Sequence, residues 1–453
     1  MKKYDLAVIG SGSAGMNLIR AAAAKGWQCA LAESGYLGGT CINVGCIPSK
    51  TLIYSARVMR LVSEANIYGV TVNQPEADWP AMVHRKNRLV GRIRNRNYSE
   101  VEKNRNIDLF EGEATFSSPQ ELNISGDKIF ADKIVIAAGT RPAIPPVSGL
   151  DKINYLTSTT AMEMDELPES IIILGGGIIA LEFSQLFHYL GVKVTIIQRN
   201  QRLAPVLDAD ISAEIQKIMT EEGIEVITSA EIRSVGNQGS KVYAEDYSRG
   251  SPVRYSAEKL LIATGRISNG DRLALDEAEV ETDERGFIKV DSSFKTSRDG
   301  IWAIGDITGG PMFTHRAWHD GMLLGKHLVE GTEITNDGRL IPFAVFTSPE
   351  IATVGMLEKE AIRAGYDARV QRFEIGHLGR ALSMEQYKGF VKLVSDRKSG
   401  KLLGAHLLTP EAGELIHELI MAIRLGATIE NLKDMMHVHP TLSESISNTA
   451  WTE

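Results

Sequence analysis

The sequence predicts an α/β fold with two Rossmann-like dinucleotide-binding domains and a C-terminal α+β dimerisation domain. Two glycine-rich turns, each between an apolar strand and a helix, predict the two nucleotide folds. A C-terminal region of short strands and helices without such a turn predicts the third domain, whose broad apolar share suits a dimer interface. At roughly 150 residues per domain, the 453 residues suffice for about three domains.

The composition is that of an ordinary globular chain. Hydrophobic residues make up 43% and charged residues 23%, and the formal net charge of -8 disfavours general attraction to nucleic acid or anionic membranes. No apolar run approaches the length of about 18 residues that a membrane-spanning helix needs. The N-terminal apolar run Leu6–Ile9 is too short for a signal peptide. We therefore expect a cytoplasmic protein with no membrane or nucleic-acid partner.

The first glycine-rich turn follows the run Leu6–Ile9 and begins a helical segment. Gly10, Gly12 and Gly15 form the pattern GxGxxG, in which the glycines permit the tight turn, the approach of a pyrophosphate and close helix packing. The unpaired amides of the helix N-terminus would face the phosphate charge. The next apolar run ends at Glu33, whose carboxylate can bind a ribose diol. This combination predicts a dinucleotide site.

The same pattern recurs after the apolar run Ile171–Leu174. Gly175, Gly177 and Ala180 occupy the three glycine positions. A helical segment and the apolar run Val194–Ile197 follow, as they do in the first copy. The repetition predicts a second dinucleotide fold.

The second copy lacks the ribose-binding acid. Its equivalent position is Gln198, and Arg199 and Arg202 stand close by in the sequence. A carboxylate there would repel a 2′-phosphate, whereas a neutral residue beside arginines would accommodate one, so this site favours NADP over NAD. The alternative is that both arginines are solvated surface residues.

Each nucleotide fold has a later apolar strand that ends in a small-residue turn, at Gly139 in the first and at Gly265 in the second. A further short strand ends at Gly305 and Asp306, where an aspartate can bind a sugar-alcohol hydroxyl. The expected boundaries are 1–147 for the first segment of the first nucleotide-binding domain, 148–270 for the second nucleotide-binding domain, 271–342 for the second segment of the first domain, and 343–453 for the dimerisation domain.

Three cysteines occur, at positions 29, 41 and 46, so a disulfide in a reducing compartment would be catalytic or redox-sensing. Cys41 and Cys46 lie at an expected helix start, which is a place that favours thiolate chemistry. An ideal helix would hold them too far apart for a bridge, so we expect a local distortion, which Gly45 and Pro48 permit. The alternatives are two buried small residues or half of a metal site. We expect no metal, because no further Cys or His ligands stand nearby.

In the order of these motifs, the sequence resembles the class I pyridine nucleotide-disulfide oxidoreductases over essentially the whole chain. The details most similar to dihydrolipoamide dehydrogenase are CINVGCIPSK at 41–50, GPMFTH at 310–315, AGE at 412–414 and HPTLSE at 439–444. The resemblance implies an enzyme, a FAD-containing homodimer that moves electrons between NAD(P), FAD, a Cys41–Cys46 disulfide and a dithiol or disulfide substrate.

The resemblance also assigns catalytic roles. Cys41 would exchange with the substrate disulfide, and Cys46 would face the flavin as the charge-transfer thiolate. The partner subunit's His439, oriented by Glu444, would take the thiol proton, which suits a group that titrates near neutrality. The alternative for His439 is a capping or core histidine.

Lys50 and Glu182 would pair beside the reactive edge of the flavin, although both could be ordinary surface charges. The residues expected to contact FAD are Gly10, Gly12, Gly15, Glu33, Gly39, Thr40, Gly139, Gly305 and Asp306. Those expected to contact the nicotinamide nucleotide are Gly175, Gly177, Ala180, Arg199, Arg202 and Gly265.

Because it has no acid at position 198, the sequence resembles the NADP-using glutathione and mercuric reductases more than the NAD-using dehydrogenases at this point. Mercuric reductase itself is disfavoured because the extra C-terminal cysteine pair is absent. We expect a small dithiol or disulfide as substrate, with lipoamide or a lipoyl carrier domain as candidates. The alternatives are an NADPH-dependent reductase of another small disulfide or oxidant, and a flavin redox sensor without turnover.

Overall fold

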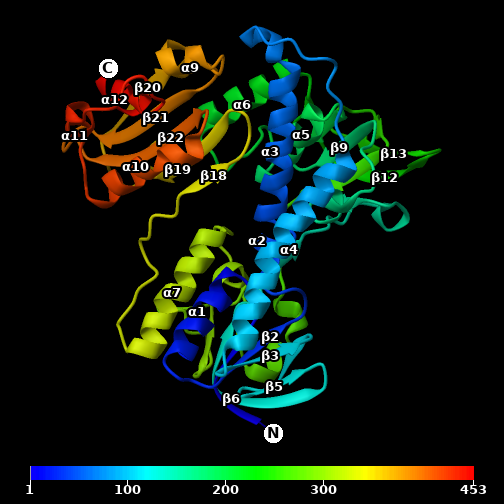
Figure 1. Ribbon diagram of the computed structural model, residues 1–453, viewed down its shortest axis with the longest axis vertical. Coiled ribbons are helices and arrows are strands. Elements are labelled where there is room, and N and C mark those ends of the chain that lie inside the picture. Colours follow the sequence, from blue (N-terminus) through cyan, green and yellow to red (C-terminus); the bar gives the residue numbers. More distant parts are fainter. Residues whose placement is uncertain (1) are drawn as a thin grey trace. The chain divides into compact units, whose positions relative to one another are not determined.

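A sheet of seven strands forms the centre of the first of two units into which the chain divides (Figure 1). The computed structural model describes residues 2–453. The first unit comprises Met1–Leu52, Pro80–Ala143 and Gly265–Arg339, and the second comprises Ile53–Trp79, Ile144–Thr264 and Leu340–Glu453. Helices α3 (Cys46–Ser63) and α4 (Trp79–Lys103) contribute residues to both units.

The core of the first sheet is parallel, as a dinucleotide fold requires. Strand β1 pairs in parallel with β2 and β6, β2 pairs with β3, and β17 pairs with β6, whereas β4 and β5 are antiparallel. The bounds are β1 Lys2–Ile9, β2 Cys29–Glu33, β3 Ile107–Glu111, β4 Ala114–Ser118, β5 Glu121–Ile124, β6 Asp127–Ile136 and β17 Ile301–Ala303. A short ladder of β7 (Thr140–Pro142) and β16 (Arg266–Ser268) completes the unit.

Two helices lie side by side over this sheet (Figure 1). They are α1 (Ser13–Ala24) and α7 (Thr314–Glu330). A Cβ atom at Gly321 would lie 2.3 Å from the carbonyl oxygen of Ala14, so the close approach of the two helices depends on a glycine at that position.

The second unit contains another parallel sheet of five strands, in the order β11-β10-β9-β15-β8. Their bounds are β8 Leu156–Thr157, β9 Ser170–Leu174, β10 Lys193–Ile197, β11 Glu225–Ile227 and β15 Lys259–Ile262. Helices α5 (Ile178–Tyr189) and α6 (Ala209–Glu222) follow β9 and β10, respectively. A three-stranded antiparallel sheet is formed by β12 Ile232–Gln238, β13 Lys241–Asp246 and β14 Val253–Ala257. Both sequence-predicted dinucleotide folds are therefore present.

The C-terminal part of the second unit is an antiparallel sheet covered by helices. Its strands are β18 Phe343–Val345, β19 Glu350–Gly355, β20 Ala368–Glu374, β21 Phe390–Asp396 and β22 Leu402–Thr409. Its helices are α8 Glu358–Arg363, α9 Gly379–Ser383, α10 Ala412–Arg424, α11 Ile429–Asp434 and α12 Glu444–Trp451. Strands β21 and β22 are buried along their whole length. Within residues 2–453, no helix combines the length and apolarity needed to cross a bilayer.

Candidate active site

The first glycine-rich turn has the geometry of a phosphate cradle. Gly10 has a φ of +105°, and a Cβ atom there would lie 2.4 Å from the carbonyl oxygen of Ala137. A Cβ at Gly15 would lie 2.0 Å from the carbonyl oxygen of Gly10, whereas a Cβ at Gly12 would meet nothing within 4 Å. Gly10 and Gly15 therefore permit the turn and the packing of α1, and Gly12 leaves open space at the helix N-terminus for a pyrophosphate.

The carboxylate of Glu33 is held beside this turn at the end of β2. Its Oε2 accepts hydrogen bonds from the backbone N–H of Ser11 at 2.8 Å and from the Ser11 hydroxyl at 2.6 Å, and its Oε1 accepts one from the N–H of Gly35 at 2.8 Å. These donors orient the carboxylate at the place where a dinucleotide fold binds the ribose diol. The residues present therefore fit the adenosine part of FAD.

A second acidic group lies in the same unit, after β17. Asp306 belongs to the single turn Gly305–Thr308, and its Oδ2 accepts from the Thr140 hydroxyl at 3.4 Å. Burial raises the pKa of Asp306, although Arg266 and Arg316 act in the opposite direction. Arg266 donates to the hydroxyl and carbonyl oxygens of Thr140, at 2.8 and 2.6 Å. Gly265 is a sequence-predicted nucleotide contact, whereas its neighbour Arg266, which bonds Thr140 and acts on Asp306, is not. The place of Arg266 directly after a glycine turn, at the start of a strand, was the signal in the sequence that could have indicated it.

The cysteine segment lies directly against the glycine turn. Gly39 has a φ of +61°, and a Cβ atom there would lie 2.7 Å from the Cα of Gly12. Helix α2 (Gly39–Asn43) carries Thr40 and Cys41 and begins at this contact. The contact places the first thiol within one helical turn of the predicted flavin cradle.

The helix that would carry both thiols is broken between them, as predicted. Helix α2 ends at Asn43, Val44 has φ -143° and ψ 15°, and α3 begins at Cys46. A Cβ at Gly45 would lie 2.8 Å from the carbonyl oxygen of Thr40, so the break requires a residue without a side chain. The distortion brings the thiols together in a way that a continuous helix would not.

Cys41 and Cys46 are both in the reduced thiol form in the structure, and they interact. A hydrogen bond with the Cys46 thiol is the largest cause of the raised pKa of Cys41, and burial is the second. The positive charge of Lys50 acts in the opposite direction. The Cys46 sulfur also lies 3.3 Å from the hydroxyl of Thr314 at the start of α7. Because a negative charge on one thiol disfavours a second one, the reduced pair favours a single thiolate.

The second glycine-rich turn repeats the geometry of the first. Gly175 has a φ of +115°, and a Cβ there would lie 2.2 Å from the carbonyl oxygen of Ala263. A Cβ at Gly177 would meet nothing within 4 Å, and Ala180 is fully buried. The two sites therefore share the cradle, including the open position in front of the helix.

The end of β10 carries no acid. Gln198 is 6% exposed, and Arg199 after it is exposed. Arg202 is half-buried and donates to the carbonyl oxygen of Pro205 at 3.3 Å. The guanidinium of Arg199 is therefore accessible to a ligand, whereas that of Arg202 is hydrogen-bonded to the backbone.

The predicted base forms an ordered pair at the C-terminus. His439 Nδ1 lies 2.8 Å from Glu444 Oε1, and the side chain of His439 is 78% exposed. The N–H of Thr441, and next the His439 ring, lower the pKa of Glu444. Because the carboxylate engages Nδ1, Nε2 is the ring atom that can exchange a proton. His437 is instead 7% exposed and paired with Glu418.

Glu182 is buried on α5, where its Oε1 accepts a hydrogen bond from the N–H of Phe346 at 3.0 Å. Lys50 lies in the first unit and Glu182 in the second, so their pairing stays a prediction. Cys29 is fully buried, and its pKa is raised to about 12 by burial. Among residues 2–453, no three His, Cys, Asp or Glu side chains are grouped as ligands for a metal ion.

Comparison with known proteins agrees with this architecture. The family model described as pyridine nucleotide-disulphide oxidoreductase matches residues 4–321, and the model of the dimerisation domain of that family matches residues 341–450. The chain is similar to mercuric reductase of Streptomyces lividans, with 38% identity over 99% of this chain and 96% of that protein. It is also similar to dihydrolipoyl dehydrogenase of Bacillus subtilis (strain 168), with 34% identity over 99% of this chain and 97% of that protein.

A solved structure has the same fold. The HOCl-induced flavoprotein disulfide reductase RclA from Escherichia coli superposes with a TM-score of 0.90 at 32% identity, covering 99% of each chain. The predicted fold class and the predicted family are thereby confirmed. The family binds FAD and a pyridine nucleotide, in agreement with the two cradles. The chain belongs to the class I pyridine nucleotide-disulphide oxidoreductases, which are FAD-dependent enzymes with a redox-active disulfide.

Proposed function

We propose that this enzyme moves electrons between a nicotinamide nucleotide and a small dithiol or disulfide, in the manner of a dihydrolipoamide dehydrogenase. The observation that carries the proposal is the pair of interacting thiols of Cys41 and Cys46 at a broken helix that touches the glycine turn at Gly12. Lipoamide, free or on a lipoyl carrier domain, is the first candidate substrate.

The proposed exchange balances as two electrons and two protons. When bound, FAD supplies the relay of two electrons between the nicotinamide and the Cys41–Cys46 disulfide. In the reducing direction, the Cys41 thiolate attacks the substrate disulfide, and one thiol leaves. The Cys46 thiolate then attacks the sulfur of Cys41, the second thiol leaves, and the intramolecular disulfide forms again. One NAD(P)H and one proton are consumed for each substrate disulfide, and two thiols are released. Oxidation of a dithiol follows the same steps in reverse.

His439 and Glu444 would provide the proton transfer. We place the partner subunit's His439 beside Cys41 of a homodimer, where Nε2 would take the proton of an attacking thiol and return it to a leaving thiolate. The exposure of His439 and the match of its region to a dimerisation domain support this arrangement. Glu444 would fix the ring orientation and stabilise the imidazolium.

A second candidate is an NADPH-dependent reductase of another small disulfide or of an oxidant. Gln198 favours this candidate because it lacks the negative charge that would repel a 2′-phosphate. The exposed Arg199 favours it because its positive charge would attract that group. Mercuric reductases and an HOCl-induced disulfide reductase are among the relatives of this chain.

The proposal is tested by anaerobic titration of the purified flavoprotein with NADPH and, separately, with NADH, followed by addition of lipoamide. We expect a long-wavelength absorbance band on reduction and its loss on addition of lipoamide. Alkylation before and after reduction should label Cys41 and Cys46 only in the reduced protein, while buried Cys29 stays unlabelled and acts as the internal control. A band that persists in lipoamide but is lost with another disulfide would favour the second candidate. Unchanged labelling would contradict both.

A further inference from the structure

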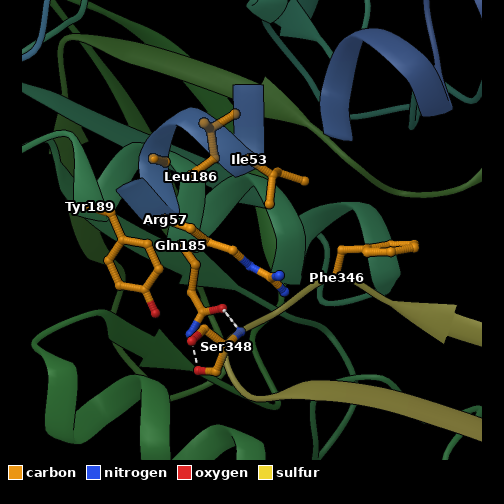
Figure 2. A pocket seen from close by; sticks show the side chains of 8 residues that line it. Ile53, Arg57, Gln185, Leu186, Tyr189, Phe346 and Ser348 are labelled. Carbon is orange, nitrogen blue, oxygen red and sulfur yellow. Dashed lines mark hydrogen bonds between the residues drawn. The ribbon is translucent and has the colours of Figure 1, made fainter. Parts of the chain in front are cut away.

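A short strap between β18 and β19 is held by side chains from two helices. The strap comprises Phe346, Thr347 and Ser348, and the partners described below lie with it in the second unit. Figure 2 shows Gln185, Arg57 and Tyr189 around it, with the side chain of Gln185 directed at Ser348. The first residue of the strap, Phe346, donates its backbone N–H to Glu182.

Gln185 forms two hydrogen bonds with the backbone of Ser348. Its Oε1 accepts from the N–H of Ser348 at 2.7 Å, and its Nε2 donates to the carbonyl oxygen of Ser348 at 3.0 Å (Figure 2). Nε2 also donates to Glu222 Oε2 at 2.9 Å. The side chain of Gln185 is 3% exposed, and both the oxygen and the nitrogen of its amide form hydrogen bonds within the protein. A two-point contact with one residue fixes both the position and the orientation of the strap.

Glu182 and Gln185 lie on the same face of α5, three residues apart. Phe346 and Ser348 are two residues apart on the strap, so the same helix face holds both ends of it. Its middle is held from α3, where Arg57 Nη2 donates to the carbonyl oxygen of Thr347 at 2.8 Å. The hydrogen bond that Glu182 accepts from Phe346 thus depends on the position of a strap that Gln185 holds at Ser348.

We infer that Gln185 is a positioning residue for Glu182. It fixes the strap so that the N–H of Phe346 stays aimed at one carboxylate oxygen, which sets the orientation of a buried acid. The inference rests on the proposed function together with the role that the family resemblance implies for Glu182, which is to pair with Lys50 at the reactive edge of the flavin. Gln185 itself touches neither substrate nor cofactor in this scheme, and it acts through Ser348 and Phe346.

The test compares Gln185→Met, which keeps the length of the side chain and removes all three of its hydrogen bonds, with Tyr189→Phe. Tyr189 is the matched control because its hydroxyl binds Arg60 and Glu222 in the same cluster and meets only the side chain of Ser348, whereas Gln185 holds the backbone of that residue. Two readouts are made on each holoenzyme: hydrogen–deuterium exchange of the peptide that covers residues 346–348, and the rate of flavin reduction by saturating NADPH in a stopped-flow instrument.

We expect faster exchange in the strap and flavin reduction slowed by at least about tenfold for Gln185→Met, because small displacements of a positioned group are costly to rate. Tyr189→Phe should lower the melting temperature and leave both readouts close to wild type. If exchange rises in Gln185→Met while flavin reduction stays at the Tyr189→Phe rate, the inference is wrong. Should Gln185→Met fail to give holoenzyme, Gln185→Glu serves in its place, since it keeps the acceptor for Ser348 and loses both donors.

Glu182→Gln separates this inference from its premise. If that variant reduces its flavin at the wild-type rate, the role expected for Glu182 beside the flavin fails, whatever Gln185 does. If Glu182→Gln is slow and Gln185→Met is not, only the inference about Gln185 fails. If both are slow and only Gln185→Met loosens the strap, the positioning role is supported.

Discussion

At the residue scale, the His439–Glu444 pair makes a separable prediction about the two half-reactions. His439→Ala should slow thiol–disulfide exchange by about a hundredfold or more, because a general base typically contributes that much, while flavin reduction by NADPH stays near wild type. The two rates are measured by mixing reduced enzyme with lipoamide and oxidised enzyme with NADPH. Equal loss in both half-reactions would remove the assigned role.

The control for that prediction is Glu444→Gln, which keeps the shape of the partner and removes its charge. The pKa of Glu444 is lowered in the folded protein, so its ionised form stabilises the native ring orientation above the unfolded-state pKa. That contribution is lost as the pH falls through the lowered value. Near neutral pH the Glu444 carboxylate should therefore stay charged, and Glu444→Gln should slow thiol–disulfide exchange while leaving flavin reduction by NADPH near wild type.

The lack of an acid at the end of β10 makes a prediction about nucleotide preference. Gln198→Glu should lower kcat/KM for NADPH by about tenfold or more and affect NADH less, because a carboxylate there would repel a 2′-phosphate. Arg199→Ala is the companion variant, and it should weaken NADPH without weakening NADH. An unchanged ratio of the two kcat/KM values in Gln198→Glu would end the case for NADP.

Individual residues were predictable where their chemistry follows from a motif. Glu33 and the glycines of both turns could be named because a dinucleotide fold needs them at fixed spacing. The contact between Gly39 and Gly12 could not, because it joins two turns through space rather than along the chain. The burial of Lys86 was not predictable either, because lysine side chains are ordinarily exposed and this one is 1% exposed.

At the element scale, the break between α2 and α3 makes a prediction about glycine. Gly45→Ala should destabilise the fold by about 1–3 kcal/mol and slow formation of the Cys41–Cys46 disulfide, because the new Cβ would lie 2.8 Å from the carbonyl oxygen of Thr40. Thermal unfolding and the rate of reoxidation of the reduced protein measure the two effects.

Gly91→Ala is the matched control. Gly91 lies in α4, and a Cβ there would meet nothing within 4 Å, so this substitution should be neutral or stabilising by up to about 1 kcal/mol. If Gly45→Ala behaves in the same way as Gly91→Ala, the break does not depend on the missing side chain.

Regular elements were the most predictable part of the fold. The strands that precede both glycine turns and the helix at Ala412 follow from apolar runs and their punctuation. The strap at 346–348 had no such signal, because its conformation is set by Gln185 and Arg57, which are distant in sequence. Sequence patterns report local structure well, and they report the partners of an irregular segment poorly.

At the scale of the whole molecule, the C-terminal region presents several large apolar side chains to solvent, two of which are near the predicted base in sequence. Leu425 is 76% exposed, Met436 98% and Val438 75%, and Trp451 in α12 is 66% exposed. Exposed apolar side chains of this size are typical of protein interfaces when they are contiguous, and the family model for this region is a dimerisation domain. A homodimer would cover these side chains and bring His439 to a second copy of the chain.

A composite site makes a prediction that no single-subunit mechanism shares. Cys41→Ser and His439→Ala homodimers should each be inactive with lipoamide, because every site lacks one of its two groups. A heterodimer with one subunit of each kind, purified through two different tags, should recover about half of the wild-type activity, since two-fold symmetry leaves one complete site. That site would combine the first subunit's His439 with the second subunit's Cys41. If each site were built from one chain, both halves of the heterodimer would be defective, and activity would stay at the level of the homodimers. Flavin reduction by NADPH, which does not need His439 in this scheme, is the internal check that the His439→Ala subunits are folded and loaded.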